Sequence, residues 1–342
     1  MEFVKSLKLN GLLSFSTDSE AIPLTGLNVL IGPNGSGKSN VIEALELLRS
    51  ISTGFANAIR VGGGAREWLW KGEPVATQAS IEAVIGGVTP IPDLRYRLDF
   101  APAGQRVEVL DEVIEEPKKR TANAKDVFFY YRFQQGHPVL NYRTVQKTTG
   151  GSPWVRRNLL RQDLAPDESI LKQRRDRDLY PEVTWLGQQF GAIQTFREWS
   201  FGRYAPVRQP QSADLPTDVL LPDARNLGLL LNAIEHTGTA IDFRDLLVRF
   251  LPGYDRFSTL VQGGTVQFFL HEKNLRMPIP ATRLSDGTIR YLALLAILLS
   301  PSPPPLLCIE EPELGLHPDA VRIIAELLVE ASERTQLIVT TH

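Results

Sequence analysis

Apolar residues recur at strand and helix spacing along the chain and divide it into candidate elements. Val4 to Phe15 and Ile22 to Ile31 are predicted to be strands, and Leu27 to Ile31, which is apolar and β-branched, is predicted to be buried. Val41 to Leu48 predicts a helix, because its apolar residues recur at helical spacing. Alternating segments then predict an antiparallel meander at Ala79 to Ile85, Leu94 to Phe100, Arg106 to Ile114, Val127 to Phe133 and Pro138 to Val145.

The rest of the chain predicts a mixture of helices and strands. Helical patterning covers Trp154 to Leu164 and Leu179 to Phe201, and a proline-rich segment from Pro206 to Pro222 predicts a linker. Further helices are predicted at Leu227 to Ile234, Asp242 to Phe250 and Asp286 to Leu299, and further strands at Phe257 to Gln262, Val266 to His271, Leu306 to Ile309 and Gln336 to Thr341. The mixed middle is therefore expected to interrupt an α/β fold whose halves lie at the chain ends.

Size and composition are those of a globular protein. The chain has 342 residues, 43% apolar and 22% charged, enough for two domains or one large domain with an insertion. The longest apolar run, Tyr291 to Leu299, is too short to span a membrane, and the N-terminus has no signal-peptide pattern. The single cysteine, Cys308, lies in a predicted buried strand and cannot form an internal disulfide. These features predict a cytoplasmic protein with no membrane partner.

The charge is unevenly distributed along the chain. The net charge is only −2, but residues 118–208 contain 17 Lys and Arg against 8 Asp and Glu. A basic middle on an acidic body is a candidate nucleic-acid surface. A solvated helical face explains the same charges equally well, because acidic residues are interspersed among the basic clusters.

A glycine-rich motif near the N-terminus carries the clearest chemistry. Gly32-Pro33-Asn34-Gly35-Ser36-Gly37-Lys38-Ser39 fits G-x-x-x-x-G-K-[ST], the phosphate-binding loop, between a predicted strand and a predicted helix. The glycines permit a tight turn whose backbone N–H groups converge on phosphate oxygens, and the helix N-terminus favours an anion. Lys38 is expected to reach the β- and γ-phosphates of a nucleotide, and the Ser39 hydroxyl to bind Mg²⁺.

A second constellation lies near the C-terminus. Leu284-Ser285-Asp286-Gly287-Thr288 begins a predicted helix capped by Ser285, which alone could be merely an N-capped core helix. The next predicted strand ends in Glu310 and Glu311, where a parallel sheet places its ligand chemistry. We expect Glu310 to hold Mg²⁺ and Glu311 to orient or deprotonate the attacking water. His342, after the last strand, is a candidate hydrogen-bond donor to the γ-phosphate.

These motifs, in this order, resemble ABC-type ATPases of the soluble branch that contains SMC, RecF and OLD-type proteins, and more narrowly the bacterial AAA family ATPases related to OLD proteins. The resemblance implies an α/β P-loop NTPase head with an antiparallel β meander and an inserted, mainly helical basic subdomain. It implies that ATP binds Gly32, Pro33, Asn34, Gly35, Ser36, Gly37, Lys38, Ser39 and Asn40, and that Ser285 and Gly287 of a second copy meet the γ-phosphate. Glu311 takes the place of the catalytic base, with His342 as the switch histidine and Lys38 as the third catalytic residue.

Several positions depart from the family pattern. Glu310 stands where aspartate is commoner, and Asp286 replaces the second residue of the transporter signature, which argues against a transporter subunit. His317 occupies the place where transporters have an aspartate. Gln78 is a weak candidate for the glutamine that senses Mg²⁺.

The resemblance also implies an organisation and a function. We expect residues 1–117 and 223–342 to form the two halves of the ATPase head, and residues 118–222 the basic subdomain. The leading hypothesis is an ATPase that dimerises around ATP and acts on DNA in repair or anti-phage defence, with a separate nuclease or other effector. The alternative is a regulatory or scaffolding ATPase that controls a protein effector without touching DNA. A small-molecule kinase fits poorly, since it would not need the signature helix.

Overall fold

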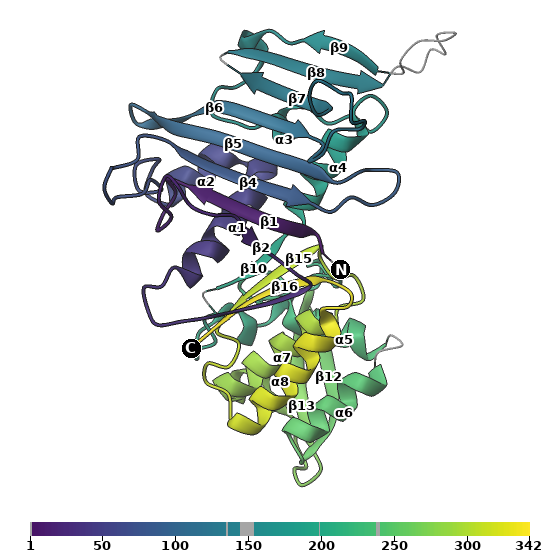
Figure 1. Ribbon diagram of the computed structural model, residues 1–342. Helices are drawn as coiled ribbons and strands as arrows, with labels where there is room; N and C mark the ends of the chain where they lie inside the picture. The colour runs from purple at the N-terminus through teal and green to yellow at the C-terminus, as the bar shows by residue number, and fades with distance from the viewer. Residues whose placement is uncertain (1, 135, 144–153, 198, 237–239) are drawn as a thin grey trace. The chain divides into compact units, whose positions relative to one another are not determined.

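The computed structural model describes residues 2–134, 136–143, 154–197, 199–236 and 240–342. The chain forms two compact units, Met1–Asn28 with Pro33–Gln194 and Val29–Gly32 with Thr195–His342 (Figure 1). The end of the strand predicted at Pro138 to Val145 and one position of the helix predicted at Leu179 to Phe201 lie outside the described residues.

The first unit contains an eight-stranded antiparallel sheet. Its order is β2-β1-β4-β5-β6-β7-β8-β9 (Figure 1). The strands are β1 (Val4–Asn10), β2 (Ile22–Pro23), β4 (Ala79–Ile85), β5 (Leu94–Ala103), β6 (Arg106–Glu115), β7 (Phe129–Gln134), β8 (His137–Arg143) and β9 (Trp154–Asn158). The predicted meander is confirmed, because β4 to β9 pair in chain order, and residue 117 lies between two strands of this one sheet.

Helices pack on one face of this sheet. They are α1 (Lys38–Thr53), α2 (Phe55–Val61), α3 (Ile170–Gln173) and α4 (Pro181–Gly191). The ring of Phe55 lies edge-on to Phe100 with centroids 5.2 Å apart, and the rings of Tyr96 and Phe190 make a similar contact at 5.2 Å. Alternate residues of β5 point to this face, so the strand pattern in the sequence directly determines the core.

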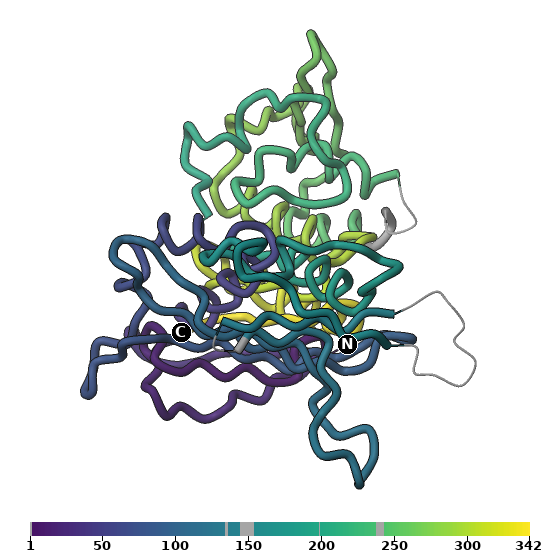
Figure 2. Tube along the Cα trace, turned by 90° about the horizontal axis from the view of Figure 1, so that it is seen from above, coloured from purple at the N-terminus to yellow at the C-terminus, as the bar shows by residue number. Residues whose placement is uncertain are grey.

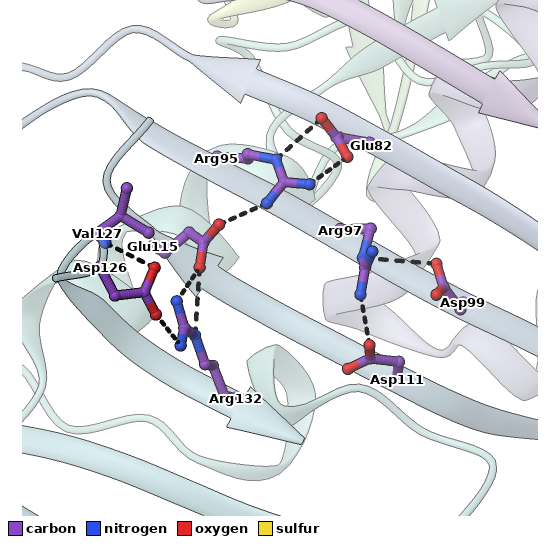
Figure 3. Close-up of polar contacts among 9 residues, drawn as sticks. All are labelled: Glu82, Arg95, Arg97, Asp99, Asp111, Glu115, Asp126, Val127 and Arg132. Atoms are coloured by element: carbon purple, nitrogen blue, oxygen red, sulfur yellow. Dashed lines mark hydrogen bonds and ion pairs between the residues drawn. The ribbon is translucent and has the colours of Figure 1, made fainter. Parts of the chain in front are cut away.

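The opposite face of the sheet carries a ladder of ion pairs (Figure 3). Arg95 pairs with Glu82 at 2.7 Å and with Glu115 at 2.5 Å, and Arg132 pairs with Glu115 at 2.8 Å. Further rungs join Arg97 to Asp99 and Asp111, and Arg132 to Asp126. Figure 2 shows the loop between β6 and β7 standing away from the sheet.

The second unit contains a four-stranded sheet with the order β10-β15-β16-β3. Its strands are β10 (Gln194–Phe196), β15 (Leu306–Glu310), β16 (Gln336–Thr341) and β3 (Leu27–Ile31). β15 and β16 pair in parallel, with Glu310 opposite Thr340. The apolar run of α7 (Asp286–Leu298) is buried almost throughout, and α8 (Pro318–Ala331) contacts α7.

A second sheet and two helices complete this unit. The strands are β11 (Gln211–Ser212), β12 (Tyr254–Gln262), β13 (Thr265–Glu272) and β14 (Ile279–Pro280), and the helices are α5 (Leu227–Glu235) and α6 (Ala240–Phe250). The ring of Phe250 stacks on Tyr291 of α7 with centroids 3.9 Å apart, and Arg249 pairs with Glu326 of α8 at 2.8 Å. No helix in the described part of the chain has the length and apolar character needed to cross a bilayer.

Three local predictions are wrong. Trp154 to Leu164 is not helical: it forms β9, which pairs with β8, and the short 3₁₀ turn Arg161–Asp163. The helix predicted to reach Phe201 ends at Gly191 and is followed by β10. β3 has no buried residue, and the side chain of Ile31 is 71% exposed, because β3 lies at the edge of its sheet. Tertiary pairing overrides the local pattern in each case.

Candidate functional site

The phosphate loop has the backbone that its glycines predict. Gly35 and Gly37 adopt positive φ values of 80° and 90°, which most other residues avoid. Gly37 is the N-cap of α1 and has no side chain with which to cap the helix, and the first turn contains no acidic residue. The first N–H groups of α1 thus keep the arrangement that favours an anion.

Side chains around the phosphate loop restrict its conformation. The Lys38 Nζ donates to the Pro33 carbonyl at 3.2 Å, so the lysine folds back over the loop that precedes it. A Cβ added at Gly37 would lie 2.9 Å from the Ser14 Oγ, so that hydroxyl would have to rotate away, and the φ of 90° would strain any other residue here. Pro33, Asn34, Gly35 and Ser36 are exposed, whereas Asn40 is half-buried. No sequence motif indicates Ser14, which lies in a separate turn.

The two predicted acids follow the buried strand β15 in the second unit. Four of its residues, including Cys308, are buried, as predicted, and Glu310 ends the strand. The Glu310 Oε2 lies 3.3 Å from the Arg197 Nε, just beyond β10, which neighbours β15. The Glu310 carboxylate therefore has a cationic partner, Arg197, which the sequence indicates only as one of the basic residues between 118 and 208.

Glu311 and His342 form a direct pair. The His342 Nε2 lies 2.6 Å from the Glu311 Oε1, and the Glu311 N–H donates to the Thr340 carbonyl at 3.0 Å. Glu311 has a φ of 47°, in the left-handed region that non-glycine residues rarely adopt. Such strain concentrates at functional positions. Parallel pairing of β15 and β16 explains why two residues distant in sequence meet here.

A pocket of about 550 Å³ opens beside these acids within the second unit. Its lining comprises Arg197, Trp199, Ser200, Arg290, Glu310, Glu311 and Leu314. The Arg290 Nη1 lies 3.4 Å from the Glu311 carbonyl, and its guanidinium faces the Trp199 and Phe201 rings. Burial lowers the pKa of Arg290, while the carboxylates of Glu311, Glu313 and Asp286 oppose that shift. The pocket thus combines two cations with Glu310, the candidate metal ligand, and Glu311, the candidate base.

The predicted signature begins α7 in the same unit. The Ser285 Oγ accepts from the Thr288 N–H at 3.1 Å, which confirms the predicted cap, and both Ser285 and Asp286 are exposed. A Cβ added at Gly287 would lie 2.9 Å from the Gly315 carbonyl, so the signature turn packs closely against the turn that follows β15. The signature and the loop after Glu311 are therefore in contact.

Two further residues singled out from the sequence are His317 and Gln78. His317 is the N-cap of α8, where its ring nitrogen accepts from the Asp319 N–H at 3.3 Å. Gln78 is exposed immediately before β4, and its role stays a prediction. The phosphate loop continues from β3 into the first unit, whereas the acids, His342 and the signature belong to the second.

The fold and these motifs define a P-loop ATPase of the ABC/AAA type, whose fold is similar to that of SMC head domains. Residues 27–342 match the model of a family described as "AAA domain, putative AbiEii toxin, Type IV TA system". The chain belongs to this family. A search of curated proteins gave no match.

Solved structures share the fold at low sequence identity. An SMC head bound to the C-winged helix domain of ScpA is 14% identical with a TM-score of 0.58, and the match covers 99% of this chain and 90% of that chain. An Smc head with an extended coiled coil, bound to the C-terminal domain of ScpA from Pyrococcus furiosus, gives 13% and 0.56, with 99% and 89% covered. An Smc head with a coiled coil and joint from Pyrococcus yayanosii gives 13% and 0.51, with 99% and 92% covered.

Proposed function

We propose that two copies of this ATPase clamp ATP between them and hydrolyse it in that state. The observation that supports this best is the second unit's own arrangement, in which an exposed signature turn lies against the loop that follows Glu311. A nucleotide that one copy holds at its phosphate loop could meet Ser285 and Gly287 of the other. The close packing of Gly287 on Gly315 would transmit that contact to the catalytic acid of the second copy.

The residues present fit ATP and Mg²⁺. The uncapped start of α1 and Lys38 supply N–H donors and a cation for the phosphates. Ser39 and Glu310 are the oxygen donors proposed for Mg²⁺, which when bound neutralises phosphate charge. Glu311 accepts a proton from the attacking water, and His342 orients the Glu311 carboxylate through the 2.6 Å contact.

The variant Glu311→Gln tests the proposed dimer. It removes the base while keeping side-chain size, so ATP binding should persist and hydrolysis should stop, and light scattering should show the mass doubling on addition of ATP. Adding Lys38→Ala to this variant is the control, because loss of the phosphate-binding lysine should keep the protein monomeric. A Glu311→Gln protein that binds ATP without any change in mass would contradict the dimer.

We also propose that part of residues 118–208 binds DNA. Several basic residues there have internal partners instead: Arg161 pairs with Glu108 and Lys172 with Glu168, each at 2.6 Å, and Arg208 is buried. The charge ladder on the outer face of the sheet is likewise self-paired (Figure 3). The exposed Lys118 and Lys119, on the loop that stands away from the sheet, are the better candidates (Figure 2).

Salt dependence tests the DNA proposal. In Lys118→Gln/Lys119→Gln, the slope of log affinity against log salt should fall by about 2, since each phosphate contact contributes nearly one unit. The matched control is Arg225→Gln/Arg244→Gln, which removes the same charge from exposed positions outside the basic stretch. A flat salt response in the parent protein, without stimulation of ATPase activity by DNA, would instead favour the regulatory ATPase that controls a protein effector.

We propose repair or anti-phage defence as the setting, with a separate nuclease or other effector protein and a cytoplasmic location. The family description, which mentions a toxin and a type IV toxin–antitoxin system, supports the defence setting. The ScpA domains bound to two of the similar SMC heads support an effector protein of some kind. Co-purification of the Glu311→Gln protein with a tagged candidate effector, with and without ATP, tests this.

A further inference from the structure

We propose that Arg208 is a positioning residue that sets both the shape and the charge of the signature turn for docking on a second copy. The inference rests on the proposed ATP-dependent dimer and names a residue that prepares one of its two surfaces. Arg208 lies at the end of the 3₁₀ turn Pro206–Arg208, more than 70 residues before the signature. Its side chain is only 3% exposed.

The guanidinium of Arg208 converges on the backbone that leads into α7. Nη1 donates to the carbonyls of Ala281 at 3.0 Å and Leu284 at 2.6 Å, and Nη2 donates to the Asp286 carboxylate at 2.5 Å. Nε donates to the Phe201 carbonyl at 2.7 Å. Ser285 is therefore fixed from both sides, because the residue before it and the residue after it are bound to the same planar group.

The charge of Arg208 matters as much as its shape. The Asp286 side chain is 70% exposed and lies beside Ser285, where we propose that the γ-phosphate of the ATP held by a second copy binds. An unpaired carboxylate at this place would repel that phosphate, and Arg208 offsets this repulsion from the buried side. Filling of the core alone does not need a guanidinium, but an apolar residue here would leave the three carbonyls that Arg208 binds without a donor.

Arg208 also joins the signature to the pocket beside the acids. The Phe201 carbonyl that it binds belongs to the segment carrying Trp199, and both Trp199 and Phe201 face the Arg290 guanidinium at 5.7 and 5.5 Å. Arg290 is on α7 and its Nη1 lies 3.4 Å from the Glu311 carbonyl. The segment 199–208 thus contacts α7 at two places.

The test compares dimer affinity in the Glu311→Gln background by analytical ultracentrifugation with ATP. Arg208→Gln should weaken the dimer by about tenfold or more, while the affinity of the monomer for ATP stays within about twofold, because the phosphate loop is not altered. Adding Asp286→Asn should restore part of the dimer affinity by removing the unpaired carboxylate, an outcome that a merely structural role would not produce. Arg203→Gln, an exposed arginine of the same segment, is the matched control and should behave like the parent.

Each result of this experiment either supports or contradicts the role proposed for Arg208. Equal dimer affinity in the parent and in Arg208→Gln would overturn the inference, as would a loss without rescue by Asp286→Asn. If Arg208→Gln does not fold, Arg208→Lys decides, because lysine keeps the charge but cannot make the four contacts, and a folded lysine variant with normal dimer affinity would overturn the role of the guanidinium. Failure of the Glu311→Gln parent itself to dimerise would count against the proposed dimer rather than against Arg208.

Discussion

Glu311 holds a backbone conformation that costs a residue with a Cβ roughly 1–2 kcal/mol, and two neighbours keep it there. Its N–H is bound by the Thr340 carbonyl, and its carboxylate is bound by His342. The φ of 47° turns the chain sharply after β15, so consecutive acids diverge: Glu310 contacts Arg197 and Glu311 contacts His342. Two adjacent carboxylates therefore have separate partners and can take separate roles.

Replacing His342 by alanine should reduce ATP turnover by about 100-fold with little change in ATP affinity. The reason is that the Glu311 carboxylate loses the donor that orients it, an effect in the usual range for a general-base partnership. Steady-state ATPase assays and fluorescent-nucleotide titration measure the two quantities. His236→Ala, at the exposed end of α5, is the control, and equal turnover in both variants would rule out the orienting role.

Glu112 is a buried carboxyl group away from the candidate site. Its side chain is 1% exposed and accepts hydrogen bonds from the Tyr96 hydroxyl, the Ser169 hydroxyl and the Ile170 N–H. Burial raises the pKa of Glu112 to about 7, although these donors oppose the shift. The folded protein therefore binds a proton here that the unfolded chain releases near its ordinary value of 4.5.

Stability should consequently fall as the pH rises from about 4.5 to about 7, by at most about 1.4 kcal/mol per pH unit for one proton. The contribution of the protonated form is complete below the unfolded pKa and is lost as the pH passes the folded one. Glu112→Gln should remove this component, so urea unfolding of the parent and the variant between pH 5 and 8 should diverge. Glu333→Gln, at an exposed position, should follow the parent, and parallel curves for Glu112→Gln would contradict the assignment.

At the scale of elements, the tight contact between α7 and the turn after β15 depends on a missing side chain. Alanine normally stabilises a helix by up to about 1 kcal/mol relative to glycine. At Gly287 the new Cβ would lie 2.9 Å from the Gly315 carbonyl, so the turn must shift. The steric cost of such a shift is about 1–3 kcal/mol and outweighs the gain in helix propensity.

We therefore expect Gly287→Ala to lower the melting temperature and to abolish the ATP-dependent increase in mass of the Glu311→Gln protein. Gly202→Ala is the matched control in the same unit, because nothing lies within 4 Å of a Cβ added at Gly202. Differential scanning calorimetry and light scattering check the two effects. A Gly287→Ala protein as stable as Gly202→Ala would show that the turn after β15 can shift without loss of stability.

Elements with a strong local pattern were predictable. The meander, α7 with its Ser285 cap, and the buried β15 follow from alternation, capping and apolar runs. β9 was not predictable, because Trp154 to Asn158 has no alternation and is a strand only through pairing with β8. The same limit applies to the site: the motifs indicate Glu310 and Glu311, but Arg197 and Arg208 depend on contacts distant in sequence.

At the scale of the whole molecule, the number of basic residues in a stretch does not show what those residues do. Residues 118–208 carry an excess of basic side chains, yet some of these are structural, such as Arg208 and the ion-paired Arg132. A count of charges cannot separate a solvated lysine from a buried arginine, because burial depends on the fold. The boundaries expected at 117 and 222 stay predictions, and the compact unit that holds the eight-stranded sheet and its helices extends to Gln194.

The ion-pair ladder on the sheet has a consequence for colloidal behaviour. An exposed apolar sheet face is an aggregation liability, and charged side chains on the face are a protection against it. Here Arg97 bridges Asp99 and Asp111 of the same sheet, so another sheet packing on this face would have to remove water from all three charged groups. The face in Figure 3 should therefore not bind another copy when nucleotide brings two copies together.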